Sequence, residues 1–193
     1  MLRKLYDWTM HLAATRHAPK ALAGISFAES SFFPIPPDVL LIPMVLSDRA
    51  KAWWYATLCT LASVLGALGG YVIGAFLLDA VAMPLLSLYG YADRFAEFAD
   101  IYNEWGAWIV LIAGVTPFPF KVVTVASGAT GLDLAAFIVF SIIARGARFY
   151  AVAGLLYFFG APVRAFIEER LGLVFTVGVV ALIGGFVLLK FVV

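Results

Sequence analysis

The sequence is poor in charged residues, in histidine and in cysteine. Only 13% of its 193 residues are Asp, Glu, Lys or Arg, two are histidine, and Cys59 is the single cysteine. A soluble domain usually carries about 25% charged residues, so this chain has too few to cover a soluble globule. One cysteine cannot form an internal disulfide, and a net charge of +1 offers no general attraction for nucleic acid. A secreted disulfide scaffold and a nucleic-acid-binding domain are therefore excluded.

Apolar residues dominate what is there. They make up 64% of the chain, and the mean hydropathy is +1.00. Segments 52–78, 134–160 and 171–190 are each long enough to cross a bilayer, which takes about 20 residues. The composition predicts an all-α, polytopic helical bundle in which residues 1–193 form a single integral membrane domain. We expect it in a bacterial cytoplasmic membrane.

Two further apolar segments, 21–47 and 107–131, are interrupted by prolines. A helix cannot continue through such a run, and each half is too short to span. We therefore expect two re-entrant helical hairpins, each entering the membrane and returning to the same side. The prolines expected at the hairpin breaks are Pro34, Pro36, Pro37, Pro117 and Pro119.

The hairpins belong to two similar halves. Segment 21–84 forms a first repeat and segment 107–162 a second, each with a hairpin followed by a long span. Residues 1–20 are predicted to form a basic amphipathic helix, and residues 85–106 an acidic interfacial helix. The distribution of Lys and Arg places the N-terminus in the cytoplasm and inverts the second half relative to the first.

Five ionisable residues lie in apolar surroundings and are the candidate substrate and proton site. Each costs roughly 2.5–3.5 kcal/mol at mid-bilayer, so all must pair, reach water or change protonation. They are Glu29, Asp38, Lys121, Arg145 and Arg148. The repeat makes Asp38 the counterpart of Lys121, and the two could meet at mid-depth. Guanidinium groups suit a phosphate, but salt bridges that only hold the hairpins together are the alternative interpretation.

A second tier of polar and small residues accompanies these charges. Ser30, Ser31 and Thr116 could bond to a ligand, although such hydroxyls often bond to their own helix. Gly66, Gly70 and Gly74 form a stripe that predicts close helix packing. The two histidines lie near the N-terminus, and no metal-binding cluster, metal cofactor or hydrolase motif is found. We therefore expect neither an enzyme nor a metal site.

The runs E-S-S-F-F-P-I-P-P-D at 29–38, G-V-T-P-F-P-F-K at 114–121 and R-G-A-R-F-Y at 145–150 resemble the DedA superfamily. The similarity is to its YqaA-like branch, which carries the VTT, or SNARE-associated Golgi protein, domain. Arginines typically surround the second proline motif in this family, where the chain has Gly114 and Lys121. The resemblance implies movement of lipids across bilayers and assigns the membrane acids to Glu29 and Asp38.

The expected function is translocation of an anionic lipid, either a polyprenyl phosphate or a phospholipid, with proton coupling. The expected partners are membrane lipids with a phosphate headgroup, and a homo-oligomer is compatible with the sequence. An uncoupled phospholipid scramblase is the alternative within lipid transport. A membrane assembly or homeostasis factor that transports nothing is the alternative from another class.

Overall fold

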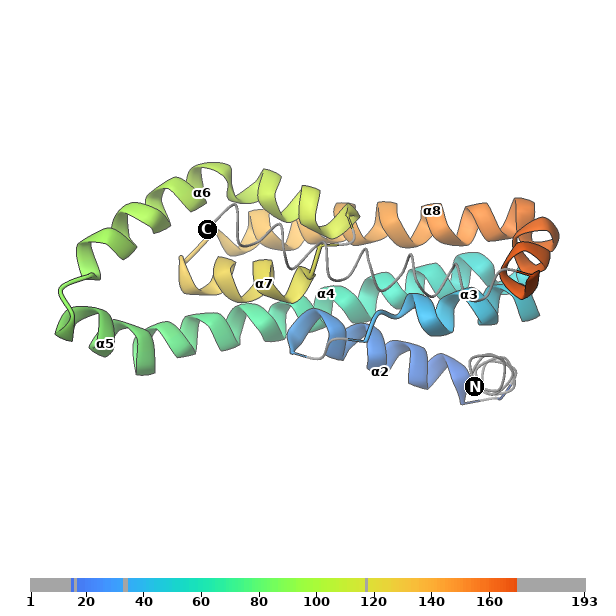
Figure 1. Cartoon of the computed structure of the whole chain (residues 1–193), viewed down its shortest axis with the longest axis horizontal. Coiled ribbons are helices and arrows are strands. Elements are labelled where there is room, and N and C mark those ends of the chain that lie inside the picture. The colour runs from blue at the N-terminus through green and yellow to red at the C-terminus, as the bar shows by residue number, and fades with distance from the viewer. Residues whose placement is uncertain (1–14, 16, 33–34, 117, 170–193) are drawn as a thin grey trace.

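The computed structural model describes residues 15, 17–32, 35–116 and 118–169. This part of the chain consists of helices and short turns, without a strand, so the predicted all-α class is confirmed there (Figure 1). Most of the predicted amphipathic helix at 1–20 and the whole predicted span at 171–190 lie outside it. The helices are α2 (Ala18–Ser31), α3 (Asp38–Ser47), the 3-10 turn η1 (Arg49–Lys51), α4 (Ala52–Leu77), the π-turn η2 (Leu78–Ala82), α5 (Met83–Leu88), α6 (Ala92–Val115), α7 (Phe120–Ala129) and α8 (Leu134–Glu169).

Two helical stretches are long and apolar enough to cross a membrane, Arg49–Leu88 and Leu134–Gly160. Many of their large apolar side chains face outward, and four of these form one exposed stripe along α4. These are Leu61, Leu65, Val72 and Phe76. Small polar side chains lie inside instead, and Arg145 has the largest fully buried side chain described. Apolar groups outside and polar groups inside are the arrangement expected of a protein whose solvent is lipid.

Both proline segments interrupt the helices, as predicted. The first break separates Ser31 from Asp38, and Pro37 precedes the first residue of α3. The second separates Val115 from Phe120, where Pro119 precedes α7. In Figure 1 the pair α2–α3 occupies one half of the long axis and the pair α6–α7 the other, and each pair turns back toward its own end. Both breaks therefore lie near the middle of the long axis.

The glycine stripe of α4 allows both helix pairs to lie against one helix. A Cβ atom at Gly66 would overlap the carbonyl group of Phe27 on α2, and one at Gly74 would overlap that of Val125 on α7. Gly70 lies between them, where a Cβ would collide with the Thr124 hydroxyl. Helix α4 is thus the common support on which the two pairs meet.

Two hydrophobic clusters result, one for each helix pair. The first joins α2, α3 and the start of α4 to Phe149, Ala153 and Leu156 of α8. The second joins α6 and α7 to Ala67 of α4 and Phe137 of α8. Because α8 contributes to both clusters, its middle turns cross the boundary between them.

Three predicted boundaries differ from the structure. The acidic segment 85–106 is no separate element: Gly90 makes a left-handed turn, with φ 72°, and α6 then continues from Ala92 past 106 without a helix breaker. The first long helix continues beyond 78 to Leu88, and the π-helical turn η2 lies directly before α5, which contains Pro84. Helix α8 likewise continues beyond Pro162, with a kink at Phe159.

Candidate functional site

Arg145 and Glu29 form a buried ion pair at the junction of the two clusters. Nη2 of Arg145 donates to Oε2 of Glu29 over 2.5 Å, and their side chains are 1% and 14% exposed. Nε of Arg145 donates to the Ser63 hydroxyl of α4 over 2.6 Å. Ser30 completes the network with hydrogen bonds to Glu29 and Ser63. Helix α8 is thereby tied to the last turn of α2 and to the middle of α4.

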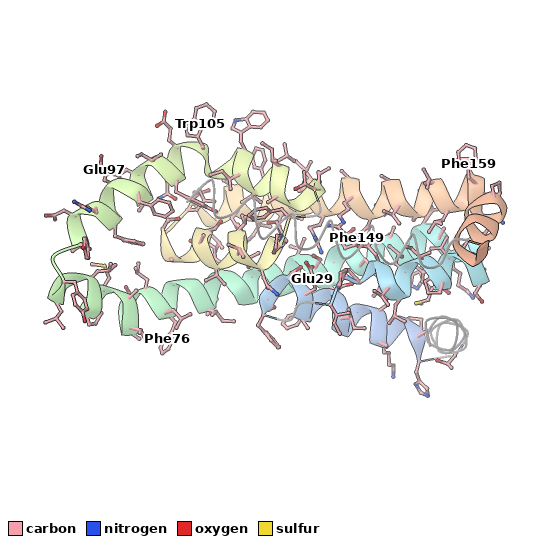
Figure 2. The ribbon with its side chains drawn as sticks, in the orientation of Figure 1. Glu29, Phe76, Glu97, Trp105, Phe149 and Phe159 are labelled. Atoms are coloured by element: carbon pink, nitrogen blue, oxygen red, sulfur yellow. The ribbon has the colours of Figure 1, made fainter. Side chains whose placement is uncertain are left out.

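Two aromatic rings lie against the Arg145 guanidinium group. Its central carbon lies 4.9 Å from the centroid of Phe120 and 4.8 Å from that of Phe149, and both rings are fully buried. Phe120 belongs to the second hydrophobic cluster and Phe149 to the first. Figure 2 shows Glu29 and Phe149 near the middle of the long axis. The remaining nitrogen, Nη1, is buried and has no hydrogen-bond partner among the described residues.

Arg148 forms a second ion pair one turn further along α8. Its Nη2 donates to Oδ2 of Asp38 over 2.6 Å, and its Nη1 to the backbone carbonyl of Thr116 over 3.1 Å. Asp38 is the first residue of α3 and Thr116 directly follows α6, so the Arg148 guanidinium joins the two breaks. The other Asp38 oxygen, Oδ1, is buried without a partner in the described part of the chain.

Comparison with known proteins agrees with this architecture. The VTT domain family matches residues 35–158, which include the end of the first break, the whole second break and both arginines. The chain belongs to the DedA family. An uncharacterized protein of Haemophilus influenzae is 36% identical over 95% of this chain and 96% of its own length. An uncharacterized protein of Histophilus somni is 33% identical over 86% and 87%. No solved structure matches the chain.

Membership of the DedA family makes this a membrane protein, in agreement with its two long apolar helices. Four of the five predicted site residues come together in this DedA-family chain, as the pairs Glu29–Arg145 and Asp38–Arg148. Two carboxylates neutralise two guanidinium groups, so the cluster is neutral when all four are ionised. Each pair also joins residues from opposite halves of the chain.

The expected meeting of Asp38 and Lys121 does not occur. Asp38 pairs with Arg148 instead, and half-buried Lys121 forms no ion pair with the described residues. The reason is geometric: Asp38 opens α3, whereas Lys121 is the second residue of α7. A shift of one residue on a helix turns a side chain by about 100°.

The second-tier residues Ser30, Ser31 and Thr116 make different kinds of contact in and around the site. Ser31 donates to the Phe27 and Gly66 carbonyls and so binds helix α2 to helix α4, while Ser30 lies in the charged network. Thr116 meets Arg148 through its backbone oxygen. Of the break prolines, Pro36, Pro37 and Pro119 accept backbone hydrogen bonds that start α3 and α7. Pro34 and Pro117 lie outside the described residues.

Sequence reasoning missed three contributors to the site. Ser63 shares a helix face with Gly66 and Gly70, which marks it as a polar group on a packing surface. Phe149 follows Arg145 by four residues and therefore lies on the same face. Phe120 carried no local signal, because only the tertiary fold brings its ring to Arg145 of α8.

The site presents paired charges and hydroxyl groups within a largely apolar body. Among the described residues, no three His, Cys, Asp or Glu side chains lie close enough together to hold a metal ion. The chemistry that such groups offer is reversible binding of an anion or a proton, with exchange of ion-pair partners.

Proposed function

We propose that this DedA-family protein is a membrane transporter that moves an anionic, phosphate-headed lipid across the bilayer. The observation that carries the proposal is the double ion pair in which Arg145 and Arg148 of one span meet Glu29 and Asp38 at a break between short helices. Charge at mid-membrane depth is costly and is kept mainly where it serves a path for ions or substrates.

In this proposal, α2–α3 and α6–α7 are re-entrant hairpins that enter from opposite sides. They extend from opposite ends of the molecule and turn back near its middle, where α3 and α7 begin (Figure 1). The N-termini of these two helices add positive potential near the arginines. An anionic headgroup arriving from either side would thus find its counter-charges halfway across.

We further propose a bacterial cytoplasmic membrane and a cytoplasmic N-terminus. The relatives in Haemophilus influenzae and Histophilus somni are bacterial, and Arg49 and Lys51 lie in the turn directly before α4. The acidic face of α6, with Asp93, Glu97 and Asp100, would then lie outside.

Proton coupling follows from competition for the arginines. A carboxylate that takes up a proton loses most of its attraction for guanidinium, which is then free to bind phosphate. Phosphate offers more acceptor oxygens than a single carboxylate and can engage a guanidinium through two parallel hydrogen bonds. Uptake of protons by Glu29 or Asp38 would therefore favour loading of the lipid.

The test is reconstitution of the purified chain into sealed vesicles containing a trace of chain-labelled phosphatidic acid or phosphatidylcholine. A membrane-impermeant reductant reports how much label reaches the outer leaflet. We expect faster movement of phosphatidic acid than of phosphatidylcholine, and a rate that changes with an imposed pH gradient. Equal movement of both lipids, insensitive to the gradient, would indicate a scramblase. Movement no faster than in empty vesicles would contradict transport and favour an assembly factor.

A further inference from the structure

The two arginines of α8 differ in how firmly they are held. The side chain of Arg145 is 1% exposed, and its guanidinium lies against two fully buried rings, one from each hydrophobic cluster. Moving this group would require both clusters to open. Ser63 and Glu29 also fix two of its nitrogens. Arg145 is therefore a fixed cation.

Arg148 is held more lightly. Its side chain is 19% exposed, and no described aromatic ring stacks on it. Its terminal nitrogens each donate to a single oxygen, one from Asp38 and one from the Thr116 backbone. These two nitrogens form the edge with which guanidinium grips a phosphate through two parallel hydrogen bonds. A ligand that took this edge would replace both oxygens at once.

We infer that Arg148 is the side chain that takes the lipid phosphate, while Arg145 stays in place as a structural cation that keeps Glu29 neutralised. This assignment rests on the proposed function and divides roles within the same site. Binding of phosphate to Arg148 releases the carboxylate of Asp38 and the carbonyl of Thr116. Both helix breaks then lose their link to α8 in one step.

The released Asp38 carboxylate needs a new hydrogen-bond donor, and Arg145 can supply one. Asp38 already interacts electrostatically with Arg145, whose Nη1 is buried without a partner among the described residues. Oδ1 of Asp38 is an equally unpartnered acceptor. Asp38 can therefore pass from Arg148 to Nη1 of Arg145, which supplies a hydrogen-bond donor for the released carboxylate. This exchange makes Asp38 the competitor of the lipid for Arg148.

The surroundings of Asp38 favour a lipid over a free anion. Ile35 and Val39, on either side of it along the chain, are 41% and 51% exposed. An apolar chain attached to a phosphate on Arg148 can lie along these side chains, whereas free phosphate gains nothing from them.

The experiment compares two matched substitutions, Arg148→Lys and Arg145→Lys, in the purified full-length chain. Binding of dioleoyl phosphatidic acid and the unfolding temperature are measured for each variant. Lysine keeps the charge but not the two-pronged geometry, so Arg148→Lys should weaken binding by about tenfold or more. Arg145→Lys should lower the unfolding temperature yet leave the affinity of the folded protein within about twofold. The reverse pattern, or equal loss in both, would overturn the assignment.

Three further arms complete the test. Asp38→Asn weakens the competitor and should tighten lipid binding about fivefold; unchanged or weaker binding contradicts the exchange. If Arg145→Lys does not fold, Phe149→Leu, which removes one ring from Arg145, replaces it with the same expectation. Lys51→Gln removes an exposed cation and should leave the affinity unchanged; a loss as large as that in Arg148→Lys would mean that net charge alone governs binding.

The ligand itself is tested with inorganic phosphate as competitor. It should displace phosphatidic acid only weakly, and equal affinity for the two would assign the site to a free anion and contradict the lipid. A wild-type protein that binds no phosphatidic acid would refute the proposed function itself. A wild-type protein that binds it while both lysine variants behave alike would refute only the division of roles.

Discussion

Glu29 accepts a 2.5 Å hydrogen bond from Arg145, a residue 116 positions further along the chain. This contact joins the end of the first short helix to the middle of the last long one. Arg148 repeats the pattern one turn later with Asp38. Two ion pairs thereby hold the first helix pair against α8, and the predictions below concern what happens when individual links are removed.

Loss of Glu29 should destabilise the protein strongly. Glu29→Ala leaves Arg145 as an uncompensated buried charge, which typically costs about 3–5 kcal/mol. Removing both charges together, as Glu29→Gln with Arg145→Met, should recover most of that loss because no unpaired charge remains. Unfolding by denaturant in detergent measures both variants. A Glu29→Ala protein as stable as the wild type would show that the pair contributes nothing to the fold.

An exposed ion pair provides the control. Lys51 donates to Asp48 over 2.6 Å and lowers the pKa of that carboxyl group, but the Lys51 and Asp48 side chains are 60% and 38% exposed. Such exposed pairs contribute little to stability, because water and salt screen their attraction. Lys51→Ala should therefore lie close to the wild type in the same unfolding series.

Ser63 should contribute more to the stability of the protein than a serine in an apolar helix usually does. Ser63→Ala deprives Nε of Arg145 of its acceptor, and a buried donor left without a partner costs about 1–3 kcal/mol. Ser47→Ala, at an exposed position, should change the stability by less than about 0.5 kcal/mol. Thermal unfolding of the two variants compares them directly. Equal effects would argue that Ser63 is a packing residue only.

The glycine stripe predicts a sharp contrast between similar substitutions. Gly66→Ala would force a methyl group against the carbonyl group of Phe27, and backbone cannot give way as a flexible side chain can. We expect a loss of about 1–3 kcal/mol or more. Gly24→Ala points into open space, with no atom within 4 Å, and should stabilise helix α2 by up to about 1 kcal/mol. If both substitutions stabilise the protein, α2 does not lie as close to α4 as described.

Cysteine labelling tests the inverted arrangement. Ala50 and Asp100 are both exposed; Ala50 lies at the start of the first long helical stretch and Asp100 beyond its end. In a Cys59→Ala background, Ala50→Cys should react with an impermeant reagent from the cytoplasmic side and Asp100→Cys from the outside. Permeabilised membranes, in which both should react, are the control. Labelling of both cysteines from one side of intact membranes would rule out the inverted topology.

Much of the fold could be predicted because the signals were local. Length and hydropathy indicated both long helices, and paired prolines marked both breaks, since proline removes an N–H wherever it stands. The predicted end of the acidic segment 85–106 is wrong, because a change from polar to apolar residues does not by itself end a helix. The first half of α6 is rich in acidic residues and its second half is apolar, and the helix continues through both.

The charged residues of the site were also visible in the sequence, but their pairing was not. Asp38 was expected near Lys121 from the register of the repeats, whereas a side chain's direction depends on the residue at which its helix starts. The stacking of Phe120 and Phe149 on Arg145 arises from contact between the two hydrophobic clusters. Contacts of this kind depend on packing between distant segments, which a local pattern does not encode.

The most direct test of the central claim is the rate at which labelled phosphatidic acid crosses vesicles containing either the wild type or Arg148→Lys. Lys51→Gln serves as the control, and all three proteins are reconstituted at equal density with confirmed insertion. The account predicts rapid movement with the wild type and Lys51→Gln. With Arg148→Lys it predicts a rate of at most about one tenth of the wild-type rate. Equal rates for the wild type and Arg148→Lys would contradict the claim that this arginine handles the lipid phosphate.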